Sequence, residues 1–318
     1  MKKMIVIGVA ILAVLLVIAA LINQKPDEPK EPAVDAGVVD TQPTEDAPSW
    51  VPALPSGLSI SAKSYFVFDC QQNTYTVASQ APTDKCYPTG ITKLFTAYVA
   101  LQYLQQDARI TVGEGLNLVK AGSNLAELEK GDVVNPTMLV RGMILADGSD
   151  AAYILAEEAG RAIKNDPAMT AADAVNAFVE EMNLQAQNMG LTGTKFLNPD
   201  GYHTESQYTC YSDLVAIAGK AMENPVIMEA AKLDRMTEAF YVGGPVHWKN
   251  NNALVDPDSA NYCPYALGLK TGSDSASGNC LLTALDVNGQ RYVVGVFGCA
   301  KEEDCATDTL LLLNELIS

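Results

Sequence analysis

Residues 87–97 read YPTGITKLFTA and open the segment that organises the fold. After Pro88, apolar side chains recur at intervals of three and four residues, which is the spacing of a helix packed on one face. They are Ile91, Leu94, Phe95, Tyr98, Leu101 and Leu104. We therefore expect a central helix here.

Strand patterns lie on both sides of this helix along the chain. They are residues 63–69 and 74–78 before it and, after it, a strand leading to Lys270 and a hairpin over 279–298. The residues between them, 90–240, read mostly as helix. The sequence therefore predicts an α+β domain whose antiparallel sheet is formed by N- and C-terminal segments, with a large helical insertion.

A second helical stretch is expected to be interrupted. It opens at Pro136, breaks at Asp147-Gly148, resumes at Asp150 and is expected to stop at Gly160. Further helices are expected over 170–190, where Thr170 and Asp173 form a capping box, over 212–222 and over 308–317.

The N-terminus carries an uncharged apolar run, Met4 to Ile22, after Lys2 and Lys3. A helix of this length spans about 28 Å of hydrocarbon, enough to cross a membrane. Because no convincing small-residue cleavage site follows, residues 1–23 are expected to be an uncleaved anchor rather than a secretory signal. The lysines place the rest of the chain outside the cytoplasm, tethered to the membrane or, if the segment is cleaved, secreted.

Residues 24–49 contain five prolines and seven acidic residues and few aliphatic ones. Such a segment buries too little surface to fold, so we expect a disordered linker. The folded domain is expected over residues 50–318.

The composition excludes several functions. With 48% hydrophobic residues the chain is not disordered throughout, and its net charge of −17 disfavours nucleic acid as a partner. Its only two histidines, His203 and His247, lack ligand-like neighbours, so no metal site is expected and both are interpreted as surface or packing residues.

Seven cysteines fit an exported domain with some disulfides. Asn288-Gly289 is a strong hairpin signal, and the hairpin would bring Cys280 and Cys299 nearly opposite each other. One hypothesis is a disulfide between them. The alternative is two small buried side chains on neighbouring strands.

Four segments in order carry a family resemblance: residues 61–64 (SAKS), 87–97, 198–201 (NPDG) and 268–272 (GLKTG). The chain from about 63 to 318 resembles the penicillin-binding serine D-alanyl-D-alanine carboxypeptidases, low-molecular-weight enzymes that trim peptidoglycan stem peptides. The resemblance implies a β-lactamase/DD-peptidase-like fold, and hydrolysis of a terminal D-Ala-D-Ala bond without metal or organic cofactor. The segment 198–201 alone would be read as a turn.

The family's first motif, Ser-x-x-Lys, places a nucleophile and its base one helical turn apart. Lys93 stands at the lysine position, but Gly90 stands at the serine position and has no side chain. Thr89 and Thr92 carry hydroxyls, but neither is in register with Lys93.

The second motif, Ser-x-Asn, aligns with Asp147-Gly148-Ser149. In the family, the serine hydroxyl shuttles protons beside the lysine and the asparagine amide holds substrate. Asp147 would instead place a carboxylate near Lys93 and favour its ammonium form, which is a poor base. Ser149 cannot offer the donor and acceptor pair of an amide.

The third motif, Lys270-Thr271-Gly272, is intact. The resemblance implies that Lys270 and the Thr271 hydroxyl receive the substrate's terminal carboxylate, while Gly272 lets the ligand backbone lie against the strand. The backbone N–H groups of Gly90 and Ser273 would take the oxyanion-hole positions.

These observations favour a membrane-anchored, catalytically impaired relative that binds peptidoglycan stem peptides or β-lactams non-covalently. Two alternatives remain open. One is an active carboxypeptidase that uses Thr89 or Thr92 as nucleophile. The other is a non-catalytic exported domain that binds a partner protein, in which Lys93 and Asp147 form only a structural ion pair.

Overall fold

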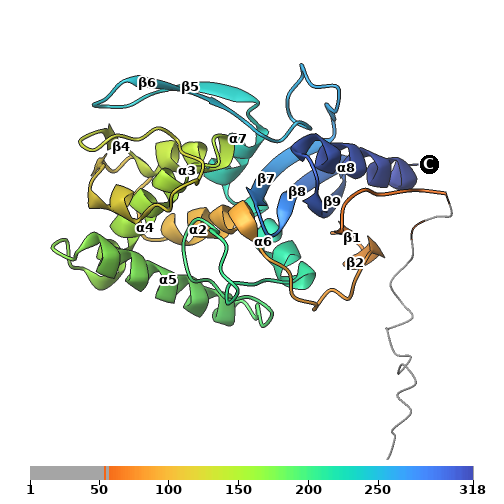
Figure 1. The fold of residues 1–318 in the computed structure, drawn as a ribbon, viewed down its shortest axis with the longest axis horizontal. Coiled ribbons are helices and arrows are strands. Elements are labelled where there is room, and N and C mark those ends of the chain that lie inside the picture. Colours follow the sequence, from red (N-terminus) through yellow and green to blue (C-terminus); the bar gives the residue numbers. More distant parts are fainter. Residues whose placement is uncertain (1–53, 55–56, 318) are drawn as a thin grey trace, which may run out of the picture. The chain divides into compact units, whose positions relative to one another are not determined.

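The C-terminal hairpin lies at the centre of the main sheet. Strands β8 (Gly278–Val287) and β9 (Gln290–Cys299) meet at Asn288-Gly289, where φ is +54° and +87°. Positive φ at both positions matches the right-handed twist of the two strands, which is why the Asn-Gly signal predicts this turn correctly. The computed structural model describes residues 54 and 57–317, all within the unit Ala47–Ser318 (Figure 1).

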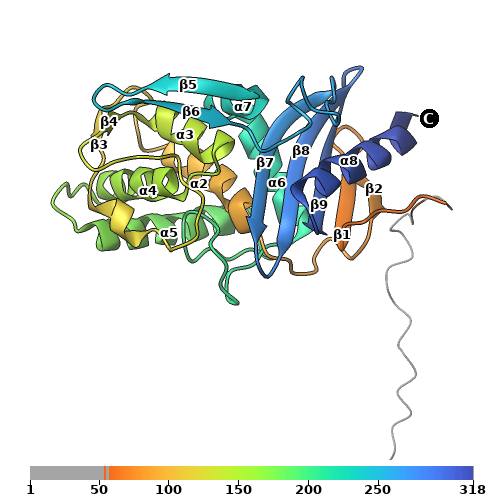
Figure 2. The same cartoon turned by 45° about the horizontal axis from the view of Figure 1, so that its top comes forward.

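Segments far apart in the sequence complete this sheet. Strand β7 (Ala266–Asp274) pairs with β8, while β1 (Ser64–Asp69) pairs with β9 and β2 (Thr74–Ala78) pairs with β1. All pairs are antiparallel and the order is β2-β1-β9-β8-β7. The predicted α+β class, with its sheet built from both ends of the domain, is confirmed (Figure 2).

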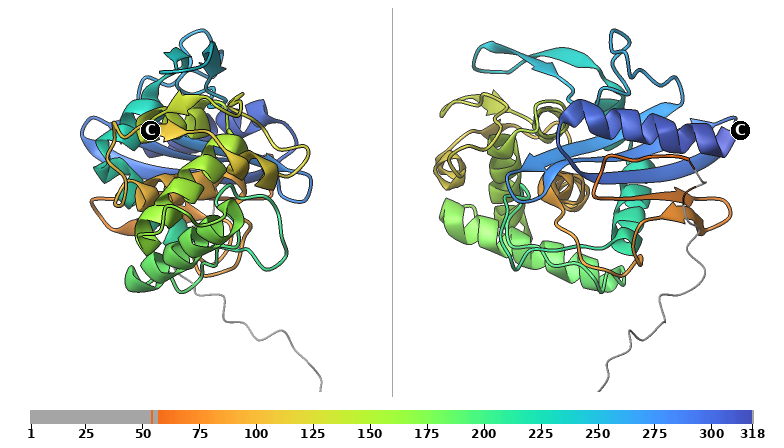
Figure 3. Two further views of the ribbon diagram at one scale, coloured as in Figure 1. Left: turned by 90° about the vertical axis from the view of Figure 1, so that its left-hand side faces the viewer. Right: turned by 45° about the vertical axis from the view of Figure 1, so that its right-hand side comes forward.

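Both faces of the sheet are covered, because side chains alternate between two apolar clusters. Helix α8 (Glu302–Ile317) covers one face, where Val67, Leu281 and Val296 are buried. The opposite face, with Phe66, Leu282 and Val293, packs against the helical region (Figure 3).

The helical region is built around α2 (Thr92–Ala100), which a single 3-10 turn, η1 (Thr89–Ile91), precedes. Leu94, Phe95 and Ala97 are fully buried, which confirms the expected central helix, although it ends at Ala100 rather than near Leu104. The other helices are α3 (Pro136–Leu145), α4 (Ser149–Lys164), α5 (Ala171–Asn188), α6 (Tyr211–Glu223) and α7 (Pro225–Lys232).

Helix α4 does not stop at Gly160, as the sequence predicts, but continues to Lys164 and ends at Asn165 in the left-handed conformation. Gly160 serves packing instead. A Cβ atom there would overlap the backbone carbonyl of Ala174 at the start of α5. The glycine therefore permits close contact of two helices and is not a cap.

The region 90–240 also contains short strands that the prediction of a mostly helical region misses. These are β3 (Ile110–Thr111), β4 (Val133–Val134) and β5 (Arg235–Ala239), which pairs with β6 (Pro245–Lys249), and a second 3-10 segment, η2, covers Glu114–Leu118. Helix α8 begins at Glu302, six residues before the predicted start, and Lys270 lies within β7.

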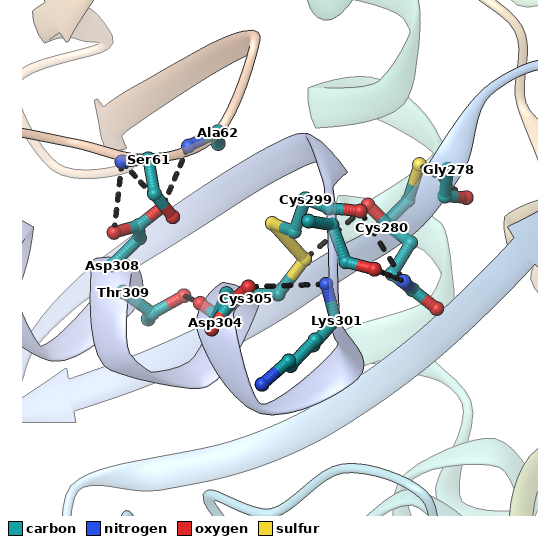
Figure 4. The surroundings of a disulfide bond; sticks show 12 residues. Ser61, Ala62, Gly278, Cys280, Cys299, Lys301, Asp304, Cys305, Asp308 and Thr309 are labelled. Atoms are coloured by element: carbon teal, nitrogen blue, oxygen red, sulfur yellow. Dashed lines mark hydrogen bonds between the residues drawn. A yellow bond between two sulfur atoms is a disulfide. The ribbon is translucent and has the colours of Figure 1, made fainter.

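The hypothesis of a Cys280–Cys299 disulfide is wrong. Cys299 is bonded to Cys305 in the first turns of α8, and Cys280 is a free thiol (Figure 4). The regular register from the Asn288-Gly289 turn places Cys280 opposite Phe297, and a bulge between Asn279 and Cys280 then places Cys299 opposite Asn279. The hairpin therefore brings the two cysteines close without pairing them.

The expected anchor (1–23) and linker (24–49) lie outside the described residues. Within the described part of the chain, no helix has the length and apolar character needed to span a membrane.

Candidate functional site

A cavity of about 680 Å³ lies where the start of α2 meets β7 and the α3–α4 connection. Its lining is mostly polar. It includes Gly90, Lys93, Asn124, Asp147, Ser149, Asp200, Gly201, Tyr202, His203, Ser273, Asp274 and Asn279, together with Ala121, Gly122, Ser123, Ser275, Gly278 and Ala300. The fold thus gathers residues of the first two sequence motifs around one space. The third motif, Lys270-Thr271-Gly272, does not line the cavity, and only the next residue, Ser273, does.

Lys93 lies in the first turn of α2 and is almost completely buried. Its Nζ donates to Asp147 Oδ1 at 3.0 Å and to the backbone carbonyl of Asp200 at 2.9 Å. The predicted proximity of Lys93 and Asp147 is confirmed.

Asp147 lies in the short connection between α3 and α4, with a left-handed backbone (φ +54°) that turns its side chain into the cavity wall. Its Oδ1 accepts from Lys93 and also contacts Lys270 Nζ at 2.8 Å, while Oδ2 accepts from Asn124 Nδ2 at 3.0 Å. One carboxylate therefore bridges two lysines. Sequence reasoning predicted the first of these contacts but not the second.

The bridge keeps Asp147 ionised although it is buried. Burial alone raises the pKa of a carboxyl group, but the charges of Lys270 and Lys93 outweigh it and lower the pKa of Asp147 to about 2. The Lys270 ammonium is fully enclosed, and it also donates to the Thr271 carbonyl at 2.7 Å. Burial lowers the pKa of Lys270, and the nearby charge of Lys93 adds to this while Asp147 opposes it.

Gly90 and Asp147 are sterically coupled. A Cβ atom at position 90 would lie 2.7 Å from Asp147 Oδ1, and 3.2 Å from both Gly272 Cα and the Thr271 carbonyl oxygen. Real side chains do not approach so closely, and Asp147 is held by three donors. A serine side chain at position 90 therefore competes with the Asp147 carboxylate for the same space.

Gly272 has a packing role in addition to the one that the resemblance implies. A Cβ atom there would overlap Thr89 Oγ1 and lie 2.6 Å from Gly90 N. The missing side chain therefore lets η1 approach β7. Thr271 is buried, whereas Ser273 is exposed and lines the cavity with Gly90.

The two threonines considered as nucleophiles lie outside the cavity lining. Thr89 and Thr92 are 1% and 2% exposed, and neither lines the cavity. Thr89 has a left-handed backbone (φ +48°), and its Oγ1 lies against Gly272, where a Cβ atom would overlap it.

Ser149, the third residue of the second motif, begins α4 and is buried in the cavity lining. Its backbone N–H donates to the Asn124 carbonyl at 2.8 Å. The next residue, Asp150, accepts from the backbone N–H groups of Ala126 and Leu128 at 2.7 and 3.0 Å. These hydrogen bonds hold the loop at 121–128 against the start of α4, where it forms one wall of the cavity. No sequence motif indicated this wall.

Residues 198–201 form the expected turn and also contact α2. The Pro199 carbonyl accepts from Thr96 Oγ1 at 2.6 Å, and the Asp200 carbonyl accepts from Lys93. Gly201 has φ +85°, and a side chain there would overlap the Thr89 carbonyl. The turn therefore helps to position Lys93. Interpreting residues 198–201 only as a turn misses this role.

The two histidines lie apart from each other. His203 lines the cavity and packs edge-on against Tyr87, with ring centroids 4.6 Å apart, while His247 lies on β6 and bonds Thr237. In the part of the chain that the structure describes, no three His, Cys, Asp or Glu side chains are grouped to hold a metal ion.

Comparison with known proteins agrees with this arrangement. Residues 51–301 match the family model described as D-alanyl-D-alanine carboxypeptidase. The D-alanyl-D-alanine carboxypeptidase of Streptomyces sp. strain K15 is 30% identical over 232 residues, which cover 70% of this chain and 76% of that protein. Escherichia coli K12 DacC is 26% identical, with 76% of this chain and 57% of that protein covered.

Solved structures are similar over most of the described chain. The Streptomyces K15 DD-transpeptidase superposes with a TM-score of 0.72 at 28% identity, covering 81% of this chain and 97% of that one. Penicillin binding protein 5 from Haemophilus influenzae gives 0.68 at 25% identity, covering 82% and 72%.

Proposed function

The chain belongs to the D-alanyl-D-alanine carboxypeptidase family, and we propose that it is an exported, catalytically impaired member that binds peptidoglycan stem peptides without hydrolysing them. One observation carries this proposal: the Asp147 carboxylate lies beside Gly90 and bridges Lys93 and Lys270. The relatives are named as carboxypeptidases or transpeptidases, and both names describe cleavage or transfer at a peptide carbonyl.

Acyl transfer at this site would need a nucleophile and a base to remove its proton. Gly90 supplies no hydroxyl, and Lys93 is paired with an ionised carboxylate. The change at position 90 and the change at position 147 also fit each other sterically, since either a side chain at 90 or the Asp147 carboxylate can fill the space. Matched changes of this kind support an evolved loss of turnover.

Peptide binding is supported by the outer edge of β7. This strand ends the sheet order, and no strand among the described residues pairs with its other edge. Ser273 and Asp274, at its end, line the cavity. An extended peptide can add to such an edge through backbone hydrogen bonds, a common mode of peptide recognition.

Export and membrane attachment are part of the proposal because of the apolar run between Met4 and Ile22 and the lysines before it. The disulfide between Cys299 and Cys305 supports an oxidising compartment.

The test is the intact mass of the full-length chain after incubation with a reporter penicillin. The unaltered chain should form no adduct, and Gly90→Ser should form little because Asp147 occupies the space of the new side chain. A triple variant, Gly90→Ser with Asp147→Ser and Ser149→Asn, should be acylated at position 90. An adduct on the unaltered chain at Thr89 or Thr92 would refute the loss of turnover. Failure to bind any stem peptide would favour a partner-binding domain instead.

A further inference from the structure

The cavity contains buried charge, but among the described residues it offers no free cation. Its lining includes one lysine, Lys93, one histidine, His203, and three acidic side chains, Asp147, Asp200 and Asp274. The Lys93 side chain is 3% exposed, and its ammonium already donates to Asp147 and to the Asp200 carbonyl. The lining is therefore acidic overall.

The second ammonium at this place is sealed from the cavity. Lys270 does not belong to the lining, its side chain is 0% exposed, and it contacts Asp147 Oδ1 at 2.8 Å. Lys120 and Lys301 adjoin lining residues along the chain but do not line the cavity themselves. An entering carboxylate would therefore have to displace Asp147 to reach a cation.

Displacing Asp147 is unfavourable because its contacts satisfy both oxygens. Lys93 and Lys270 share Oδ1, and Asn124 donates to Oδ2. A ligand carboxylate that left Asp147 in place would lose its water shell and face negative charge without a cation to pair with. A neutral peptide end meets neither penalty, and the end of β7 at Ser273 and Asp274, which lines the cavity and pairs with no described strand on its outer edge, can bond it.

We infer that the cavity selects a peptide without a free C-terminal carboxylate, one that ends in an amide or continues through a further peptide bond. The Asp147 carboxylate already occupies the position between Lys93 and Lys270 that a ligand carboxylate would need. This inference rests on the proposed peptide-binding function and names the class of peptide. The negative charge of Asp147 thus disfavours the wrong ligand, a peptide with a free carboxylate, by repulsion.

The test uses titration calorimetry on the full-length chain with two probes that differ at one group. They are diacetyl-L-Lys-D-Ala-D-Ala with a free carboxylate and the same peptide as its carboxamide. We expect the carboxamide to bind about tenfold or more tightly than the acid, since the penalty for an unpaired like charge exceeds one factor of ten.

Two variants test whether Asp147 causes the preference for the carboxamide. Asp147→Asn should abolish or reverse the preference, because it removes the negative charge and leaves the positive charges of Lys93 and Lys270 uncompensated beside the cavity. Glu180→Gln makes the same change in net charge on α5, where the side chain is 74% exposed, and should leave the ratio unchanged.

Each outcome decides the inference. Equal binding of the two probes by the unaltered chain, or tighter binding of the acid, overturns it and leaves the proposed function standing. Binding of neither probe refutes the proposed function, and the inference with it. An unchanged ratio in folded Asp147→Asn shows that Asp147 is not the cause. If that variant does not fold, the ratio of the two affinities on the unaltered chain still supports or overturns the inference.

Discussion

Replacing Asp147 by asparagine should destabilise the fold strongly at neutral pH. The substitution keeps the shape of the side chain but leaves two buried ammonium groups, on Lys93 and Lys270, without a counter-charge. Removing one member of a buried ion pair typically costs about 3–5 kcal/mol of unfolding free energy. We expect a loss within this range, because the Lys270 side chain is fully enclosed.

The dependence of stability on acidic pH gives a second, independent test of the ion bridge at Asp147. The pKa of Asp147 is lowered from 3.8 to about 2 in the folded chain, so its contribution is complete above the unfolded value and is lost as pH falls through the folded one. The difference corresponds to about 2 kcal/mol. The unaltered chain should lose this amount between roughly pH 5 and pH 2, and Asp147→Asn should not.

The assay is urea unfolding of the full-length chain, its Asp147→Asn variant and Glu180→Gln as the matched control, in one detergent buffer at pH 7 and at several acidic pH values. The control should stay within about 0.5 kcal/mol of the unaltered chain, since its side chain is exposed. An Asp147→Asn variant as stable as the control at pH 7, with the same acid slope as the unaltered chain, would contradict the ion bridge.

Three further predictions concern the scaffold of the site and are measured by urea unfolding. Replacing Cys299 and Cys305 by serine should lower the unfolding free energy by about 2 kcal/mol, the chain-entropy value for so short a loop, and reducing agent should then have no further effect. Gly160→Ala should destabilise by about 1–3 kcal/mol because its Cβ meets a backbone carbonyl of α5, whereas Gly219→Ala on α6, which meets nothing within 4 Å, should be neutral or slightly stabilising. Asp308→Ala should lower the unfolding free energy by about 1–3 kcal/mol, because this carboxylate accepts hydrogen bonds from the backbone N–H groups just before β1. An unchanged urea midpoint would argue that these hydrogen bonds do not stabilise the fold.

The elements with local signals were predictable from the sequence. The Asn-Gly hairpin, the apolar stripe of α2 and the cap of α5 at Thr170 each depend on neighbours within a few residues, and each has the predicted type. The motif residues at positions 90, 93 and 147 could also be placed together, because the family resemblance supplied their order in the fold.

The details that decide the chemistry depend on contacts between distant segments. Lys270 meets Asp147 across 123 positions of sequence, and the loop at 121–128 becomes a cavity wall only through Asp150. Gly160 looked like a helix end because its close approach to α5 is invisible in a local pattern. The register of the hairpin places Cys280 opposite Phe297, and Cys299 bonds to Cys305 of α8 instead.

The missing side chain at the nucleophile position is plain from residue identity, the sheet built from both ends of the domain follows from short-range patterns, and the motifs carry the family resemblance. That the Asp147 carboxylate fills the space beside Gly90 and contacts two lysines at once depends on how distant segments pack. The physical reason is that charge pairing in a buried site depends on distances of about 3 Å, and packing sets those distances among segments that the sequence keeps far apart.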